Sequence, residues 1–280
     1  MSALSHKIDF AIIFSVKHAN PNGDPLNGNR PRTDYDGFGE VTDVCLKRKV
    51  RDRLQTEGHQ IFVQCNEKKT DGMVSLKARA EADKPIGLGK EVFKKNKDHA
   101  AALACGQWLD VRSFGQVFAF GKETDAAGVS IAIRGPVTIQ SAFSVDPVSI
   151  TSTQITKSVN GEGNSDIKKS PDTMGMKHRV DSAIYVVYGA MTPQLAEKTK
   201  FSDEDAESIK AILPKLFEGD ESSARPAGSM AVKKVIWWQH NSKAGQYSSA
   251  KVHQSLTVNA DGSYELESLD GLVPEQIDGF

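Results

Sequence analysis

Apolar residues gather along this chain in short runs that favour β-strands. Three runs are rich in β-branched and aromatic residues, so each is expected to form a buried strand: 8–16, 180–191 and 232–238. A shorter strand is expected at 60–65. The run 129–139 has the same character, but Pro136 is expected to interrupt it because proline cannot donate a hydrogen bond to a neighbouring strand.

A helical period is present in two of the segments between these strands. The first helix is expected over about 43–57, with Thr42 or Asp43 as its cap and an apolar stripe formed by Leu46, Val50 and Leu54. The second helix is expected to open at Ser202 with a start that resembles a capping box. Pro214 should kink or shorten its far end.

The order of these elements indicates a fold class. Strand, helix and strand occur in succession, followed again by strands, a helix and a strand. That order is typical of a split-βαβ, ferredoxin-like sheet, so an α+β fold is expected. Neither an internal repeat nor a linker divides residues 1–280, and a single domain with insertions is therefore predicted.

Three stretches interrupt the pattern. Residues 20–39 hold four Gly, three Pro and four Asn, which is loop chemistry, and a loop of this length is either functional or mobile. Residues 67–112 are charged and are expected to form an insertion with a helix at about 91–103. Residues 148–179 are rich in Ser, Thr, Lys and Gly, and should protrude around a hairpin turn at Asn160-Gly161.

Charge and cysteine content narrow the function classes. The chain has 35 Lys and Arg against 36 Asp and Glu, which excludes a nucleic-acid binder of strong overall basicity but not one with a local basic face. Residues 256–280 carry six acids and no Lys or Arg, so charge is unevenly distributed. Three widely spaced cysteines and the lack of an 18-residue apolar run predict a soluble protein of the reducing cytoplasm, with no membrane partner.

The common enzyme motifs are missing from the sequence. A P-loop fails at Gly121-Lys122 because Glu123 follows, and there is no GxGxxG, HExxH or GxSxG pattern. The seven histidines lack ligand spacing, and Asp34-x-Asp36-Gly37 matches only half of a calcium loop. We therefore expect no catalytic residue, no metal site and no cofactor.

The basic segment 45–54, CLKRKVRDRL, is the strongest chemical signal. Lys47 and Arg51 are i, i+4 neighbours on one helix face, about 6 Å apart, which suits two successive phosphates of a single strand. A solvated helix face is the ordinary alternative. The preceding segment carries Arg30 and Arg32, and its Gly, Asn and Pro residues could bring backbone N–H groups close to phosphates or simply form a connection with Asx turns.

Two further segments offer candidates, each with a structural alternative. Met174 and Met176 lie among basic residues and could wedge between unstacked bases, or pack in the core under a loop. Phe114, in a segment 108–116 that is expected to be loop or strand, could stack on a base, although a buried position is the commoner fate of phenylalanine.

Taken together, four motifs give the chain a family resemblance. NPNGDPLNGNRPRTD, VTDVCLKRKVRD, RGPVTIQSAFSVDPVSITSTQIT and DTMGMKHRVD occur in that order. With these motifs the chain resembles the CRISPR-associated backbone subunit of type I Cascade, and most closely that of the type I-C system. The resemblance covers essentially the whole chain, and the first two motifs are specific in combination.

The resemblance implies a modified RRM-like palm with a fingers insertion at 67–112 and a thumb β-hairpin at 150–179. It implies a crRNA-binding ribonucleoprotein subunit of antiviral defence, whose copies stack head-to-tail along the guide RNA and present it to a target DNA strand. Its other implied partners are the large subunit and the guide-processing subunit of Cascade. The thumb would kink the RNA so that every sixth base is turned out, with Met174 as the candidate wedge.

Sequence motifs and resemblance together give one set of expected RNA contacts: Asn22, Arg30, Arg32, Lys47, Arg48, Arg51, Ser113, Phe114, Gln116, Lys157, Met174, Lys177, His178 and Arg179. The aromatic pattern by which RRM domains read bases is absent, so contact by charge and shape without sequence readout is expected.

Two enzymatic alternatives remain open. Backbone subunits of type III complexes carry a loop aspartate that cleaves bound target RNA with a metal ion, and Asp24, Asp34 and Asp36 lie in the comparable loop. A guide-processing endoribonuclease would need a general acid–base such as His18 or His59.

Overall fold

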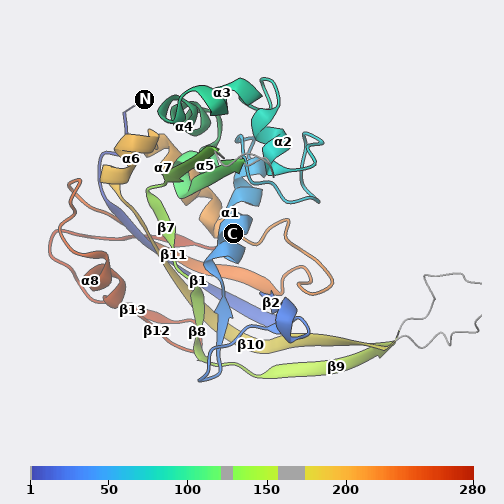
Figure 1. Cartoon of the computed structure of the whole chain (residues 1–280). Coiled ribbons are helices and arrows are strands. Elements are labelled where there is room, and N and C mark those ends of the chain that lie inside the picture. Colours follow the sequence, from blue (N-terminus) through green and yellow to red (C-terminus); the bar gives the residue numbers. More distant parts are fainter. Residues whose placement is uncertain (1, 121–128, 157–173) are drawn as a thin grey trace, which may run out of the picture.

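One antiparallel sheet forms the centre of the molecule (Figure 1). The computed structural model describes residues 2–120, 129–156 and 174–280. The main path of the sheet runs, in spatial order, through β14 (Glu275–Asp278), β11 (Met230–Gln239), β1 (Ile8–Ala19), β10 (Met174–Met191), β8 (Ala142–Pro147) and β4 (Phe38–Val41). Two further strands, β7 (Val137–Ile139) and β9 (Ile150–Thr156), also pair with β10.

The three long strand predictions are confirmed. β1 lies between β10 and β11, which is why its apolar run is almost wholly buried. β10 is longer than expected because its first seven residues pair with β9 and extend beyond the core. The predicted interruption at Pro136 is also confirmed, since β6 (Val129–Arg134) ends before it and β7 begins after it.

Two helices with clear local signals pack on one face of the sheet. α1 (Asp43–Thr56) starts at Thr42, whose hydroxyl accepts a hydrogen bond from the Cys45 amide at 3.3 Å, and its predicted apolar stripe is buried. α7 (Asp203–Ile212) opens with a full capping box between Ser202 and Asp205. Pro214 falls in the 3₁₀ turn η2 (Leu213–Lys215) that ends this helix.

Three local predictions are wrong. Residues 60–65 form no strand, because the amides of Phe62 and Val63 donate to the Asp110 carboxylate at 2.7 and 3.0 Å instead of to a neighbouring strand. Residues 109–114 are the helix α5 (Leu109–Phe114). The helix expected at 91–103 is two helices, α3 (Lys90–Lys95) and α4 (Lys97–Gln107), because Asn96 caps the second.

A second apolar cluster lies apart from the sheet. Its aromatic rings contact one another, with 4.7 Å between the ring centroids of Phe62 and Trp108 and 5.0 Å between those of Phe62 and Phe118. The elements around it are α2 (Leu76–Glu81), α3, α4, α5, and the hairpin of β5 (Gly115–Phe120) and β6. This cluster includes residues on both sides of 67–112, and those bounds for a fingers insertion stay a prediction.

The C-terminal segment covers the sheet face opposite α1. Ala11, Ile13 and Trp238 of the sheet pack there with Val252 and Leu256. The covering elements are α8 (Ser249–Gln254) and a hairpin of β12 (Leu256–Val258) and β13 (Tyr264–Leu266), which turns at Asp261-Gly262. The other short elements are α6 (Pro193–Thr199), η1 (Pro25–Asn27), β2 (Gly23–Asp24) and β3 (Arg30–Pro31). None of the helices within the described ranges has the length and apolar composition needed to cross a bilayer.

The acidic C-terminal residues are paired partly within the chain itself. Glu275 of β14 lies 2.5 Å from the Lys210 ammonium, and Asp278 lies 2.5 Å from that of Lys234. They join the edge strand β14 to α7 and β11, but both acids are largely exposed, so each pair contributes little to stability. The segregated acids therefore do more than solvate the end of the chain.

Asp9, near the start of β1, anchors the C-terminal cover to that strand. Its buried carboxylate lies 2.8 Å from His240 Nε2, 3.0 Å from Lys7 Nζ and 3.5 Å from His253 Nε2. The Gln246 amide donates to His240 Nδ1 at 3.0 Å, which leaves the proton on Nε2, facing Asp9. Burial raises the pKa of Asp9, but the hydrogen bonds from His240, His253, Ser249 and Lys7 outweigh it and hold the pKa well below its usual range.

Asp9→Asn should therefore lower the free energy of unfolding by about 3 kcal/mol at neutral pH, because it breaks a buried ion pair. The folded-state pKa is depressed, so this contribution is complete above the unfolded-state pKa of about 4 and is lost progressively as the pH falls from there toward the much lower folded-state pKa. Urea titrations of both proteins from pH 7 to pH 3 measure the difference. The control is Asp278→Asn, whose side chain is 85% exposed and which should change stability by less than about 0.5 kcal/mol. If the difference in unfolding free energy between wild type and Asp9→Asn does not narrow below pH 4, the depressed pKa of Asp9 is wrong.

Candidate nucleic-acid interface

The segment between β1 and α1 is an ordered hairpin. β2 and β3 pair, η1 forms the tip, and Asn20 donates from Nδ2 to the Asn29 carbonyl at 2.7 Å. Asn22 Oδ1 accepts hydrogen bonds from the amide and hydroxyl of Thr42 at 3.0 and 2.9 Å, and so ties the hairpin to the start of α1. Arg30 is exposed on this hairpin, and Arg32 lies 3.2 Å from Asp24. Asn22 thus positions the helix, and Arg30 offers an exposed charge.

Carboxylates neutralise the basic face of α1. Lys47 pairs with Asp43 at 2.9 Å, one turn earlier. Arg48 donates at 2.6 Å both to Asp52 and to Asp220, which lies 172 positions further along the chain. The buried Lys49 ammonium also contacts Asp220. Among these three cations, Lys47 has the most exposed partner, because the Asp43 side chain is 39% exposed and lies on the same helix.

Arg51 is directed into the molecule. Its Nε donates to Asp110 Oδ2 at 3.1 Å, its guanidinium lies 5.1 Å from the centre of the Phe114 ring, and its side chain is 14% exposed. Lys47 and Arg51 do share a helix face, as predicted, but Arg51 joins α1 to α5 and is not free for a phosphate. The same contact covers one face of Phe114.

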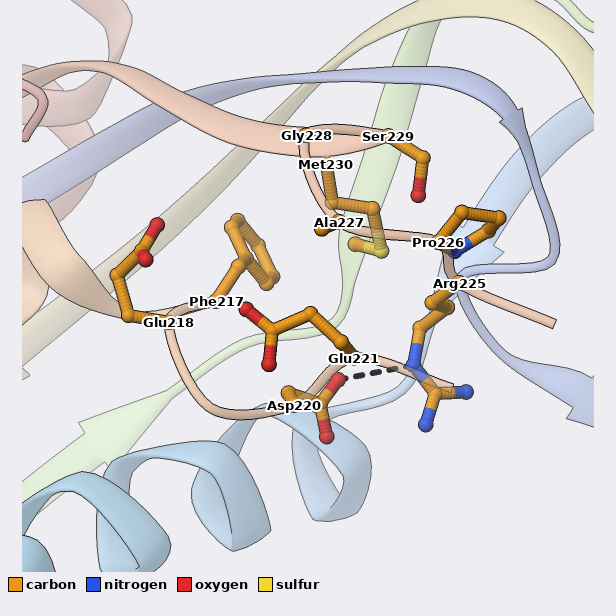
Figure 2. A pocket seen from close by; sticks show the side chains of 10 residues that line it. All are labelled: Phe217, Glu218, Asp220, Glu221, Arg225, Pro226, Ala227, Gly228, Ser229 and Met230. Carbon is orange, nitrogen blue, oxygen red and sulfur yellow. Dashed lines mark hydrogen bonds and ion pairs between the residues drawn. The ribbon is translucent and has the colours of Figure 1, made fainter. Parts of the chain in front are cut away.

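Asp220 is the centre of the charge cluster. It accepts from Arg48, Lys49 and Arg225 Nε, the last at 2.8 Å (Figure 2). Burial raises the pKa of Asp220, but these three cations outweigh burial and hold it at about 2. Burial lowers the pKa of Lys49 and raises that of Asp52. The carboxylate of Asp220 therefore stays ionised at neutral pH and fixes α1 to the loop that precedes β11.

A cleft of about 650 Å³ opens beside this cluster. Its walls come from the β2–β3 hairpin, α1, residues 65–68 and residues 219–225, and the side chains that line it include Asn22, Arg48, Lys68 and Arg225. A smaller cavity of about 90 Å³ adjoins it between Phe217 and Met230 (Figure 2). The cleft brings together Asn22 and Arg48, two of the expected RNA contacts, and adds acids from 219–225 that no local pattern indicates.

The predicted thumb begins as a two-stranded arm. β9 and the first part of β10 extend away from the rest of the sheet (Figure 1), and their register pairs Met176 with Gln154 and Lys177 with Thr153. Lys177 and Arg179 are exposed on one face of this arm. Met174 and Met176 are 65% and 54% exposed on the other face, because neighbouring strand residues point to opposite sides.

Two of the predicted contacts have buried side chains, and one falls outside the described residues. Ser113 is fully buried and donates to the Leu109 carbonyl at 2.6 Å. His178 is buried and shares a 2.8 Å hydrogen bond with Ser152 Oγ. Neither side chain is exposed in this structure, and the contact of each with RNA stays a prediction. Lys157 and the turn at Asn160-Gly161 lie outside the described residues, and Gln116 is half-buried at the start of β5.

The comparisons with known proteins agree on one family. The sequence profile of the family described as CRISPR-associated protein Cas7 matches residues 6–272. The chain belongs to the Cas7 family. A CRISPR-associated protein Cas7 of Haloferax volcanii is 26% identical over 286 residues, which span 96% of this chain and 80% of that protein.

Solved structures of CRISPR assemblies are also similar to this Cas7 family member. One is a CRISPR RNA-guided surveillance complex, pre-nicking, with a TM-score of 0.49, 14% identity, and coverage of 83% of this chain and 78% of the other. Another RNA-guided surveillance complex gives a TM-score of 0.43 at 14% identity, covering 92% and 77%. A Type III-B Cmr-beta complex bound to cognate target RNA gives 0.43 at 10% identity, covering 82% and 60%.

Asp220→Asn should destabilise the protein by about 3 to 5 kcal/mol, because it leaves the buried Lys49 without a compensating charge. Chemical denaturation at pH 7 measures the loss. The matched control is Glu221→Gln, the next residue, which lines the same cleft and is exposed. Equal stability of the two variants would show that Asp220 does not hold the cluster together.

Proposed function

We propose that this Cas7 family member is the crRNA-binding backbone subunit of a type I-C Cascade complex. The observation that carries the proposal is the projecting β9–β10 arm, which presents Met174 and Met176 on one face and Lys177 and Arg179 on the other. Exposed sulfur side chains suit contact with unstacked bases, and exposed cations suit phosphates. On this proposal the arm is the thumb, and Met174 is the candidate wedge.

The central sheet supports a modified RRM-like palm. The order β11, β1, β10 and β8, with α1 and α7 on one face, is the order of a ferredoxin-like sheet. RRM domains read bases with aromatic side chains on the open sheet face. In this chain α8 and the β12–β13 hairpin cover that face over Ile13 and Trp238. We therefore propose that RNA is held through sugar and phosphate, without readout of its bases.

Charge placement divides the predicted contacts into two groups. The exposed cations Arg30, Lys177 and Arg179 are proposed to contact phosphates directly, with Lys47 joining them when its pairing with Asp43 opens. Arg48 and Arg51 are proposed to act indirectly, because their carboxylate partners hold α1 in place. The second apolar cluster is proposed to be the fingers.

The proposed partners follow from this role. Copies of the chain would stack head-to-tail on the guide RNA, a target DNA strand would pair with that guide, and the large and guide-processing subunits would end the assembly. Near-zero net charge supports such stacking, since neighbouring copies would not repel each other strongly.

Double substitution of Lys177 and Arg179 by alanine should weaken binding to unrelated single-stranded RNAs to the same extent. Each lost phosphate contact should reduce the magnitude of the slope of log K against log salt concentration by about 0.7. The slope for the double variant should therefore be smaller by about 1.4. Filter binding at several salt concentrations measures this slope. The control is Lys243→Ala, which removes an exposed, paired lysine from another part of the surface. An unchanged slope would contradict a role of the arm in phosphate contact.

We further propose that the chain does not cleave RNA. Two aspartates of the 20–39 segment already serve as acceptors: Asp24 receives the Leu26 amide at 3.2 Å, and Asp34 receives those of Asp36 and Phe38 at 3.0 and 2.9 Å. Complementary RNA incubated with the protein, guide and Mg²⁺ should stay intact on a denaturing gel. Cleavage that disappears in Asp34→Ala would instead support the type III-like alternative.

A further inference from the structure

The turn between β3 and β4 presents a tyrosine to solvent. Tyr35 is fully exposed, at 109% of its reference area. The turn that carries it is rigid, because the Gly37 amide donates to the Asp34 carbonyl at 3.3 Å and Asp34 Oδ1 accepts from the amides of Asp36 and Phe38. Gly37 closes the turn at φ +87°, where a side chain would be strained. The turn thus presents a large aromatic group that has no partner in the described part of the chain.

The neighbours of Tyr35 indicate what it can bind. Asp34 and Asp36 flank it directly, and both are exposed. Two carboxylates beside an aromatic ring disfavour a nucleic-acid strand, whose phosphates they would repel. They favour an apolar pocket with cations on its rim.

A cleft of that kind lies between α4, β6 and α6. It has a volume of about 440 Å³, and alanines at 101, 102 and 132 leave room in it for a large side chain. Arg134 and Lys198 are exposed on its lining and have no acidic partner among the described residues, while Asp98 adds one negative charge. Thr199 also lines it, and the hydroxyl of this 2% exposed residue lacks a hydrogen-bond partner. The cleft therefore offers space, cations and an unpaired buried hydroxyl.

The turn and the cleft lie at opposite ends of the sheet. The turn is attached where β8 leads into β9, since the Val148 amide donates to the Gly37 carbonyl at 2.9 Å. The cleft adjoins the other end of β10, where Thr192 bonds to Pro136 and α6 begins. About ten β10 residues separate the two places, which is roughly 30 Å. In Figure 1, α4 and α6 are at the top, whereas β8 ends at the bottom. Tyr35 therefore cannot enter the cleft of its own chain.

We propose that Tyr35 of one copy inserts into this cleft of the next copy, with Asp34 and Asp36 facing Arg134 and Lys198. Such a contact joins two different surfaces and does not close, so it generates an open row of subunits. The inference rests on the proposed head-to-tail assembly and adds the residues that would make one of its contacts.

Binding to two lengths of single-stranded RNA tests the contact. Tyr35→Ala should leave the affinity for an RNA that holds one subunit unchanged. On an RNA that holds many subunits, the affinity of Tyr35→Ala per site should be at least about 30-fold lower than that of wild type, as expected for an interface hot spot. The charge reversals Arg134→Glu and Lys198→Glu together should give the same loss. Tyr35→Phe should bind nearly as wild type, and Leu26→Ala is the matched control because Leu26 is 98% exposed on the neighbouring hairpin.

Cross-linking tests the geometry directly. A Tyr35→Cys copy and an Ala102→Cys copy, both with the native Cys45, Cys65 and Cys105 replaced by alanine because Cys105 lines the same cleft, are mixed and oxidised with and without long RNA. They should give a disulfide-linked dimer that neither variant gives alone. Leu26→Cys mixed with Ala102→Cys should give none. A 35–35 cross-link in Tyr35→Cys alone, or no mixed dimer under either condition, would overturn the proposal.

Binding to the two RNAs distinguishes failure of this inference from failure of the proposed function. If Tyr35→Ala weakens binding to the short RNA, the turn contacts nucleic acid and the copy-to-copy contact is wrong. If the wild-type protein binds neither RNA, the proposed function fails, while the mixed disulfide without RNA still decides the contact between copies.

Discussion

Compensation of buried charge on α1 is the constraint on which the arrangement of this molecule depends. The helix has an apolar stripe toward the sheet, and beside that stripe the side chains of Lys49 and Arg51 are largely shielded from water. Asp220 and Asp110 come from distant parts of the chain to balance them. Because an unpaired buried charge costs several kcal/mol, α1 is held to the loop before β11 on one side and to the second apolar cluster on the other.

β10 couples the arm to the core. One continuous strand of 18 residues pairs with β1 along most of its length and with β9 at its beginning. A displacement of the arm is therefore resisted by the ladder with β1, which lies in the centre of the sheet. An arm built in this way can press on a bound strand without its own independent core, which suits its proposed role as the thumb.

The surface chemistry is consistent with a protein that binds a polyanion and copies of itself. Exposed cations occur on the arm and on the β2–β3 hairpin, whereas the turn at Tyr35 is acidic and the cleft near α6 is basic. Local segregation of this kind is compatible with a net charge near zero. It would let RNA and a neighbouring subunit bind at different places on the same chain.

The sequence by itself determined the elements whose signals are local. Spacing and side-chain chemistry within a few residues fix three kinds of feature: the apolar stripe of α1 around Val50, the helix caps at Thr42 and Ser202, and the apolar run of β1. The exposure of Met174 and Lys177 on opposite faces depends on the pairing of β9 with β10, because the sequence pattern predicted a strand only from residue 180. Only the tertiary structure decided that Arg51 points at Asp110, that Ser113 and His178 are buried, and that Asp220 completes the cluster on α1. Burial and ion pairing depend on which distant segments pack together, and no pattern within a single segment carries that information.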